Sequence, residues 1–430
     1  MIKIVRLFFF SIILLAGING QAQTTTSSPY SQFGLGDLKQ SLLPQSRAMG
    51  GIAMGLRKPG LYTNINVANP ASYSAVQITS FEIGQSLNLR QLSNKSVSEN
   101  SFNSSISHIA FAMPVSPKSG LSFGLLPYSE LGYNYRIPSR VDTTDIDYIY
   151  SGDGGLSKAH LGYGFQIGKH LSLGANVSYL FGKLKQSRST EFPGDYSALY
   201  SRVENSNSVG GLSYDYGIQY FTNVSSKARL IIGYSGNAGS KINSTGSTVA
   251  THYRIDPQSG EDIGILDTIF FSERDKRSLK MPMTHSVGFV IERTNRWLVG
   301  ADFNYAKWSD FTDGSVNPNL NDSYGISVGG QVTPDPTDVT NYFRLIEYRL
   351  GFKYDKTPVQ IRNTDINQYA LTFGFGFPLP ANRSAFYQIS LSAEAGQRGT
   401  QDNNLVRERY MNFHLGFTLN DRWFTKPKYD

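Results

Sequence analysis

The chain has 430 residues, with 40 Lys and Arg against 33 Asp and Glu, and its formal net charge is +7 at pH 7. It contains no Cys, which excludes a disulfide scaffold, a Cys-ligated zinc site and a thiol nucleophile. The charged fraction of 17% and the aromatic fraction of 13% also exclude a disordered charged tail and a coiled coil.

The first residues have the pattern of a secretory signal peptide. Lys3 and Arg6 precede an apolar run from Leu7 to Ile18, and small and polar residues follow as far as Ala22. This run of about 12 residues is shorter than the ~20 that a helix needs to cross a bilayer. We predict a signal peptide over residues 1–22 and, with 38 basic and 33 acidic residues left, a mature net charge of +5.

Farther along the chain, apolar residues alternate with small or polar ones. In residues 410–419 one parity is apolar from Met411 to Leu419, and the other consists of Tyr, Asn, His, Gly and Thr. The same split recurs in residues 368–377 and 159–167. Each segment predicts a strand with one apolar face and one small, polar face. A solvated sheet would show Lys, Thr and Glu on its outer face, so we expect the apolar face to contact lipid.

The alternating segments also have the length of membrane strands. They run for about 10 to 14 residues, whereas soluble strands average about 5 or 6. Aromatic residues fall near their ends, as Tyr179 with Phe181 and Trp297 with Tyr305, where interfacial girdles lie. Because backbone groups in lipid must be satisfied internally, these strands require a closed barrel. We predict an all-β transmembrane antiparallel barrel over residues 77–424.

Fourteen strands are expected in this barrel, followed by a periplasmic tail at residues 425–430. Their predicted ranges are 77–92, 102–114, 119–137, 156–168, 170–187, 208–222, 228–240, 283–293, 296–309, 323–333, 342–355, 367–378, 385–397 and 408–424. Short turns alternate with long polar connections at residues 140–155, 189–207 and 241–281. The alternation predicts that both termini lie on the periplasmic side, with the long loops outside the cell.

Residues 23–76 precede the first strand and show neither alternation nor a helical face. They could be a disordered periplasmic tail. They are, however, too apolar for a solvated tail, with Leu42, Leu43, Met49, Ile52 and Met54 among their residues. We therefore predict that this segment folds as a plug, or hatch, inside the barrel lumen.

Short motifs in the plug and in a later strand have a recognisable order. The plug holds Gly50 and Gly51 and then the run Asn69, Pro70 and Ala71, and the later strand ends in Trp308-Ser309-Asp310-Phe311. In this order the chain resembles the FadL-like family of outer-membrane transporters for long-chain fatty acids and other hydrophobic compounds. Two departures are Ser72, where the family commonly has Gly, and the continuation past Trp423 to Asp430.

The resemblance implies passive uptake of a hydrophobic molecule through an apolar lumen, with movement of the hatch. Asn69, Pro70 and Ala71 would then be gating residues, although the same run can form a simple turn. In the resembled family a kink in the third strand opens the wall sideways. Pro127 lies at the matching place, between Gly124 and Gly132, and since proline donates no ladder hydrogen bond it marks either such an opening or an ordinary bulge.

Several polar residues fall on the inward parity of the predicted strands. They are His160, Asp302, Asn304, Glu347, Arg349, Glu394 and His414. They could line a polar route, but pairing across the lumen to hold barrel and plug together is the favoured interpretation. A further acidic group, Asp142, Asp145 and Asp147, lacks the Gly and terminal Glu of a calcium loop, so we expect no metal site there.

Two functions remain open. The first is an outer-membrane channel of a Gram-negative bacterium that takes up a hydrophobic small molecule and contacts membrane lipids and lipopolysaccharide. The second is a FadL-like barrel that does not transport and serves as a subunit or docking partner in an outer-membrane protein secretion or assembly complex, as in the related type IX secretion shuttle barrel. No catalytic motif is present, so we expect no enzyme activity and no cofactor. Without Lys/Arg runs we expect no nucleic acid partner.

Overall fold

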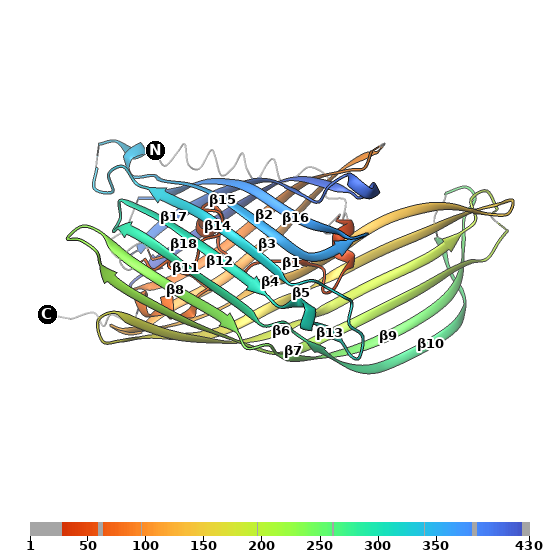
Figure 1. Ribbon diagram of the computed structural model, residues 1–430, viewed down its shortest axis with the longest axis horizontal. Helices are drawn as coiled ribbons and strands as arrows, with labels where there is room; N and C mark the ends of the chain where they lie inside the picture. Colours follow the sequence, from red (N-terminus) through yellow and green to blue (C-terminus); the bar gives the residue numbers. More distant parts are fainter. Residues whose placement is uncertain are drawn as a thin grey trace.

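The chain forms a closed antiparallel barrel with its N-terminal segment inside the lumen (Figure 1). The computed structural model describes residues 28–58, 63–95, 97–195, 197–259, 262–338, 340–380 and 385–423. The predicted signal peptide and C-terminal tail lie outside these residues. The barrel has fourteen wall strands, which confirms the predicted fold class. None of the described helices is long and apolar enough to cross a membrane.

Eleven wall strands are continuous and three are interrupted. The continuous strands are β2 (Thr79–Ser93), β3 (Ser98–Ser116), β4 (Ser119–Val141), β5 (Thr144–Ile167), β6 (Leu171–Glu191), β7 (Tyr200–Asn223), β14 (Ser323–Val332), β15 (Glu347–Ile361), β16 (Thr364–Pro378), β17 (Ala385–Arg398) and β18 (Arg407–Asp421). The interrupted ones are β8 (Arg229–Asn237) with β9 (Lys241–Ile255), β10 (Asp262–Lys280) with β11 (Thr284–Arg293), and β12 (Trp297–Ala306) with β13 (Thr312–Asp313). β18 pairs with β2 and closes the wall.

The two ends of the barrel differ. One end, the turn end, carries short connections such as Pro117–Lys118 and Gly168–His170, together with the start of β2 and the end of β18. The opposite end, the hairpin end, carries the β4–β5 and β9–β10 hairpins. Because outer-membrane barrels keep their short turns in the periplasm, we place the hairpin end outside the cell.

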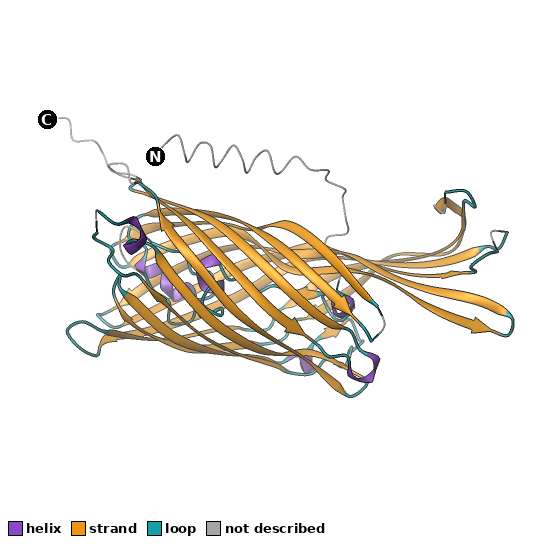
Figure 2. Cartoon of the chain, turned by 90° about the horizontal axis from the view of Figure 1, so that it is seen from above, coloured by secondary structure: helices purple, strands orange, loops and turns teal. Residues whose placement is uncertain are grey.

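The long polar loops predicted at residues 140–155, 189–207 and 241–281 are wrong, because these residues are mostly strand. β4, β5, β6 and β7 run for 21 to 24 residues, and β9 and β10 form a further hairpin. Beyond the bilayer a strand needs no lipid-facing side, so it lacks the alternation that marks the membrane part. These outer parts of β4–β7, β9 and β10, here called the projecting sheet, extend past the rest of the wall (Figure 2).

The plug, residues 28–76 of the described chain, has little regular structure of its own. It contains η1 (Pro29–Gln32), β1 (Asp37–Leu38), α2 (Pro44–Arg47) and η2 (Pro70–Ala75). Three more short helices lie in connections between wall strands: η3 (Trp308–Asp310), η4 (Tyr342–Arg344) and η5 (Asp402–Asn404). Ala48, Ile52 and Tyr73 are fully buried, so the wall supplies the packing that these short elements lack.

The outward parity of the wall is apolar as predicted. On β16, Leu371 is 62% exposed and Phe373 is 48% exposed, whereas the inward Thr372 between them is buried. β5 repeats the pattern with Leu161, Tyr163 and Phe165 outward. A water-soluble protein would not leave such a belt uncovered, and a bilayer covers it.

Candidate functional site

The plug lies directly on the wall backbone because the inward parity of the wall is rich in glycine. A side-chain Cβ added at any of five buried glycines would overlap the plug. These are Gly164 and Gly174 against Pro70, Gly217 against Asn69, Gly233 against Met54, and Gly329 against Met49. We call them the glycine belt. The small inward residues of the sequence are therefore the surface that receives the plug.

Asn69 connects two parts of the plug and reaches the wall. Its side-chain oxygen accepts from the backbone N–H of Ala71 at 3.2 Å and so caps η2, for which Pro70 is a suitable first residue. Its amide group donates to the backbone carbonyl of Met54 at 2.9 Å and to that of Ile218 on β7 at 3.4 Å. One side chain thus fixes a turn and joins it to β7.

Residues 53–54 of the plug are also held from two wall strands. The buried carboxylate of Asp302 on β12 accepts from the N–H of Ala53 at 2.6 Å and from that of Met54 at 2.9 Å. From β7, Gln219 donates to the carbonyl of Met54 at 2.9 Å. Asp302 was predicted only as a lumen-facing group, and the structure shows that it accepts hydrogen bonds from the plug backbone.

Gly50 and Gly51 form the next attachment. Both have positive φ, +72° and +96°, a backbone region that side-chain-bearing residues rarely adopt. The turn they make directs the N–H of Gly50 to the hydroxyl of Thr372 on β16 at 2.7 Å, and that hydroxyl donates to the carbonyl of Ala48 at 3.1 Å. The glycine pair therefore allows a contact that the sequence motif alone did not reveal.

Two basic residues complete the attachment near the turn end. Arg57 donates to Ser172 of β6 at 3.0 Å and to Gln166 of β5 at 3.0 Å, and its guanidinium lies 4.3 Å from the ring centre of Phe221. Lys58 forms an ion pair with Glu347 of β15. These contacts attach the plug to β5, β6 and β15.

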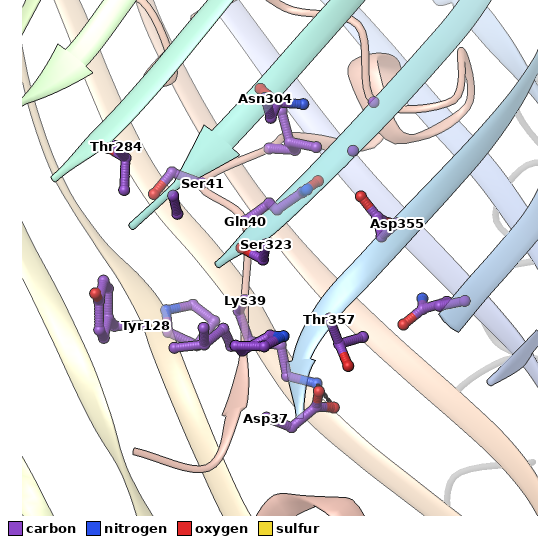
Figure 3. Close-up of a pocket in the computed structure, with 18 of the residues that line it drawn as sticks. Asp37, Lys39, Gln40, Ser41, Tyr128, Thr284, Asn304, Ser323, Asp355 and Thr357 are labelled. Carbon is purple, nitrogen blue, oxygen red and sulfur yellow. Dashed lines mark hydrogen bonds and ion pairs between the residues drawn. The ribbon is translucent and has the colours of Figure 1, made fainter. Parts of the chain in front are cut away.

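A cavity of about 470 Å³ lies in the lumen, lined by residues of both the plug and the wall (Figure 3). The lumen was expected to be apolar, and this expectation is wrong for the cavity, because charged side chains share its lining with apolar ones. Asp37 of β1 contacts Arg398 of β17 at 2.8 Å, Arg90 of β2 at 3.6 Å and Lys39 at 3.5 Å. Since most of these side chains are paired, they hold the first part of the plug to the wall.

An apolar cluster lies between the plug and the wall toward the hairpin end. We call it the outer cluster, and it consists of Leu35, Leu131, Tyr133, Leu156, Leu180, Leu184, Val209, Ile242, Leu279, Met281, Trp308, Phe311 and Leu320. Its members come from the plug, from β4, β5, β6, β7, β9 and β10, and from the β10–β11 and β12–β14 connections. The Trp308–Phe311 motif thus packs across the outer lumen at the end of β12.

The wall is incomplete between β3 and β4. Their ladder runs from Ser116–Ser119 at the turn end only as far as Ile109–Leu125. Among the described residues, none of β3 from Ser98 to His108 pairs with β4, although β3 stays paired with β2. We call this gap the lateral break. It begins just before Pro127, where the β4–β5 register shifts.

Plug residues cover the β4 edge that the lateral break leaves free. Asp37 and Leu38 of β1 pair with Glu130 and Ser129. Gly132 exchanges hydrogen bonds with the plug, donating to the hydroxyl of Ser31 at 3.1 Å. Gly124, the third residue of the predicted kink, lies in the paired part of β4 opposite Ala110 and His160.

The remaining predicted lumen residues all lie on the inner side of the wall. Arg349 forms an ion pair with Glu347, and Glu394 forms one with Lys353 at 2.7 Å. Asn304 and His414 line the cavity, while His160 is buried beside Ser122 at 3.4 Å. The structure therefore brings Glu347 and Arg349 together, and it leaves His160 and His414 apart from that pair.

Sequence reasoning missed several residues that hold the plug. They are Asp37, Arg57, Lys58, Gln219, Thr372 and Arg398. Those on the wall share the inward parity with the predicted residues, so parity was the available signal. Which of them meets the plug depends on the path of the plug, which the sequence does not encode locally.

The acidic group considered in the sequence, Asp142, Asp145 and Asp147, lies at the β4–β5 tip, where Asp145 pairs with Arg140 and Asp147 pairs with Arg136.

A closed fourteen-stranded barrel with an N-terminal plug is the fold of the FadL-like outer-membrane barrels. Within that class, the chain belongs to the family described as BamG, whose model matches residues 1–430. None of the curated proteins compared with the sequence matches it significantly.

Solved structures with this fold share little sequence with the chain. The CymD monoaromatic hydrocarbon channel is 14% identical, with a TM-score of 0.54 over 91% of this chain and 100% of that one. A Pseudomonas aeruginosa FadL homologue is 12% identical, with a TM-score of 0.57 over 90% and 99%. The Pseudomonas putida toluene transporter TodX is 15% identical, with a TM-score of 0.56 over 90% and 99%. At these identities the likeness establishes the fold alone.

Proposed function

We propose that the protein is a plugged barrel subunit of an outer-membrane protein secretion or assembly complex, and that it acts by docking partner proteins. The observation that carries this proposal is the attachment of the plug to seven wall strands through Gln166, Ser172, Gln219, Asp302, Glu347, Thr372 and Arg398. The family description BamG is consistent with such an assembly role.

The energetics of these contacts favour a plug that stays in place. Displacing it would remove two N–H donors from the carboxylate of Asp302 and would separate the carbonyl of Met54 from its donor on the wall, Gln219. Each buried group that loses its partner costs about 1–3 kcal/mol. The outer cluster would also lose packing with Leu35. In a barrel that passes solute repeatedly, we expect displacement of the plug to require less free energy than this.

A second candidate function is the passage of a hydrophobic molecule between the lumen and the bilayer. The lateral break favours it, because both sides of the break line the cavity, Ser107 on β3 and Pro127 on β4. Similar structures described as a hydrocarbon channel and a toluene transporter support this reading. The resemblance implies long-chain fatty acids as substrates, with Asn69, Pro70 and Ala71 as the gating residues and with Gly124, Pro127 and Gly132 forming the kink of the lateral exit.

Native mass spectrometry of the barrel from its own outer membrane, combined with lipid extraction, separates the two functions. The subunit function predicts partner proteins in fixed ratio to the barrel and no retained hydrophobe. The transport function predicts about one fatty acid or similar molecule per barrel and no fixed protein partner. The second result would overturn the subunit proposal.

The variant Asn69→Ala sharpens this experiment. Under the transport function it loosens the hatch and changes the amount of retained hydrophobe, because Asn69 joins η2 to Met54 and β7. Under the subunit function it leaves the partner ratio unchanged. Asn304→Ala is the matched control, since it makes the same change at a residue that lines the cavity and lies outside the plug.

A further inference from the structure

The projecting sheet ends in two free edges. On one side β4 pairs only with β5 beyond the plug. On the other side β10 pairs with β9, and with β13 only at Leu279 and Lys280. Among the described residues, no strand pairs with the second side of β10 from Asp262 to Arg277, and the carbonyl of Ser278 accepts from the backbone N–H of Gly314 at 3.1 Å. Alternate residues of the stretch from 262 to 277 therefore present backbone N–H and C=O groups to a neighbour that the chain itself does not supply.

The two edges carry different side chains. The β4 edge holds Arg136, Pro138 and Arg140, which are charges and a proline of the kind that discourage strand addition. The β10 edge has no proline, and its apolar residues are 54–64% exposed: Ile263, Ile265, Leu266, Ile269, Phe270 and Phe271. The β10 edge thus lacks the basic residues and the proline of the β4 edge, although its register with β9 shifts at four places between Asp262 and Asp275.

This exposure is not explained by lipid. On β6 the outward Tyr179 and Phe181 are followed by the outward Lys183 and Lys185, so the apolar belt ends there. The strand registers connect Lys183 through Ser208 and Thr245 to Lys276 of β10. At ~3.3 Å per residue, the stretch from Phe271 to Ile263 lies about 16–43 Å farther along the strand. Because this stretch lies beyond the lysines that end the apolar belt, we place it in the aqueous space outside the bilayer.

Charge indicates what kind of neighbour fits. Within the apolar stretch, Asp262 is paired with Arg202 of β7 at 2.8 Å, and Asp267 lies 3.0 Å from His252 of β9. The edge therefore offers hydrogen-bonding backbone and apolar side chains, with little charge that lacks a partner. A folded polar surface or a nucleic acid would not satisfy it, whereas an extended apolar polypeptide would.

We propose that the free edge of β10 binds an extended, largely apolar segment of a different protein, which adds to the projecting sheet as another β-strand. Backbone hydrogen bonds would set its register, and Ile265, Phe270 and Phe271 would pack against its side chains. The inference rests on the proposed docking function and names the surface and the mode of binding.

Hydrogen exchange on the complex purified from its own membrane tests this mode. Amides of residues 262–273 that point away from β9 should be protected in the complex and should exchange in the isolated barrel. The double variant Ile265→Lys with Phe271→Lys should lower the amount of bound partner about tenfold or more, the size of a hot-spot loss. Ile137→Lys is the matched control on the β4 edge, where Ile137 is 47% exposed, and it should change binding by less than about twofold.

Three results would overturn the inference. A complex that forms while the amides of residues 262–273 on the free edge stay unprotected leaves the docking function standing and removes this surface. A partner that proves to be a second copy of this 47.6 kDa chain excludes a different protein as occupant. Absence of any partner from the wild-type barrel removes both proposals together. If the double variant does not fold, exchange on the wild-type complex still decides.

Discussion

The two halves of the molecule differ in how far their backbone hydrogen-bonding groups are paired. In the half near the turn end, the plug fills the barrel and the glycine belt brings wall and plug into direct contact. In the half near the hairpin end, the projecting sheet leaves the β10 edge unpaired and apolar. Backbone groups are paired within the chain in the plugged half, whereas those on the β10 edge are left for the proposed added strand. Variants in the two halves should therefore affect different measurements.

The largest effect is expected at the glycine belt. In Gly329→Val the new side chain would overlap Met49 backbone atoms, so the variant should lose about 3 kcal/mol of stability or fail to fold. Urea unfolding of the barrel in lipid vesicles measures this loss. The neighbouring Val328→Phe faces lipid and should stay within about 0.5 kcal/mol of the wild type. Equal losses in both variants would contradict the direct contact of wall and plug.

Asp302→Ala should have the next largest effect. It leaves the N–H groups of Ala53 and Met54 buried without their acceptor, which costs about 2–3 kcal/mol. Hydrogen exchange should rise at residues 53–54 before it rises in the wall strands. Asp302→Asn keeps one acceptor and should lose less. If both variants exchange like the wild type, Asp302 does not hold the plug.

Asp37→Ala should loosen only the first part of the plug. It removes the carboxylate that lies among the cationic groups of Lys39, Arg90 and Arg398, so the free energy of unfolding should fall by about 2 kcal/mol. Exchange should increase over residues 28–39 and stay unchanged over residues 44–58. Increased exchange across the whole plug would show that the two parts move as one unit.

Substitution on the projecting sheet should leave the isolated barrel almost unaffected. Phe271 is 58% exposed, so Phe271→Lys should change the free energy of unfolding by no more than about 0.5 kcal/mol. The same urea unfolding experiment measures this. A loss above about 1 kcal/mol would mean that Phe271 packs within the barrel itself.

The smallest effect concerns the β14–β15 connection and its dependence on pH. The backbone N–H of Asn341, the hydroxyl and N–H of Thr340, and Arg344 hold the pKa of Asp338 well below its usual value. Because the folded pKa is lowered, the carboxylate stabilises this turn above about pH 4, and the contribution is lost as the pH falls through the folded pKa. NMR shifts of the Thr340 and Asn341 amides should follow this titration. Asp338→Asn should abolish it.

The alternation of apolar residues was enough to predict the barrel. All fourteen wall strands cross lipid, which requires an apolar residue at every second, outward position. This alternation stays visible because the polar and glycine residues fall at the inward positions. The same reasoning failed for the outer parts of β4–β7, β9 and β10, because water does not require an apolar face. Residues 201–208 are mostly polar and resembled a loop, although they are paired on both sides.

The site was predictable only as a set of inward positions. Asp302 and Glu347 were recognised because their parity points into the lumen. Their partners, the N–H groups of residues 53–54 and the side chain of Lys58, lie more than 240 residues away in the sequence. No local pattern records such a contact. Gly164 was visible as part of a small inward face in residues 159–167, and what it receives became clear only with the path of the plug.

The position of the plug also has a consequence for the order of folding. The plug leads directly into β2, and β2 is the strand that β18 must find to close the wall. η2 lies directly on the glycine-lined backbone of β5, β6 and β7, a fit that is easier to reach before the wall closes than after it. We therefore expect the plug to pack against the growing wall while the seam between β18 and β2 is still open, so that the last strand to be made closes a barrel that is already filled.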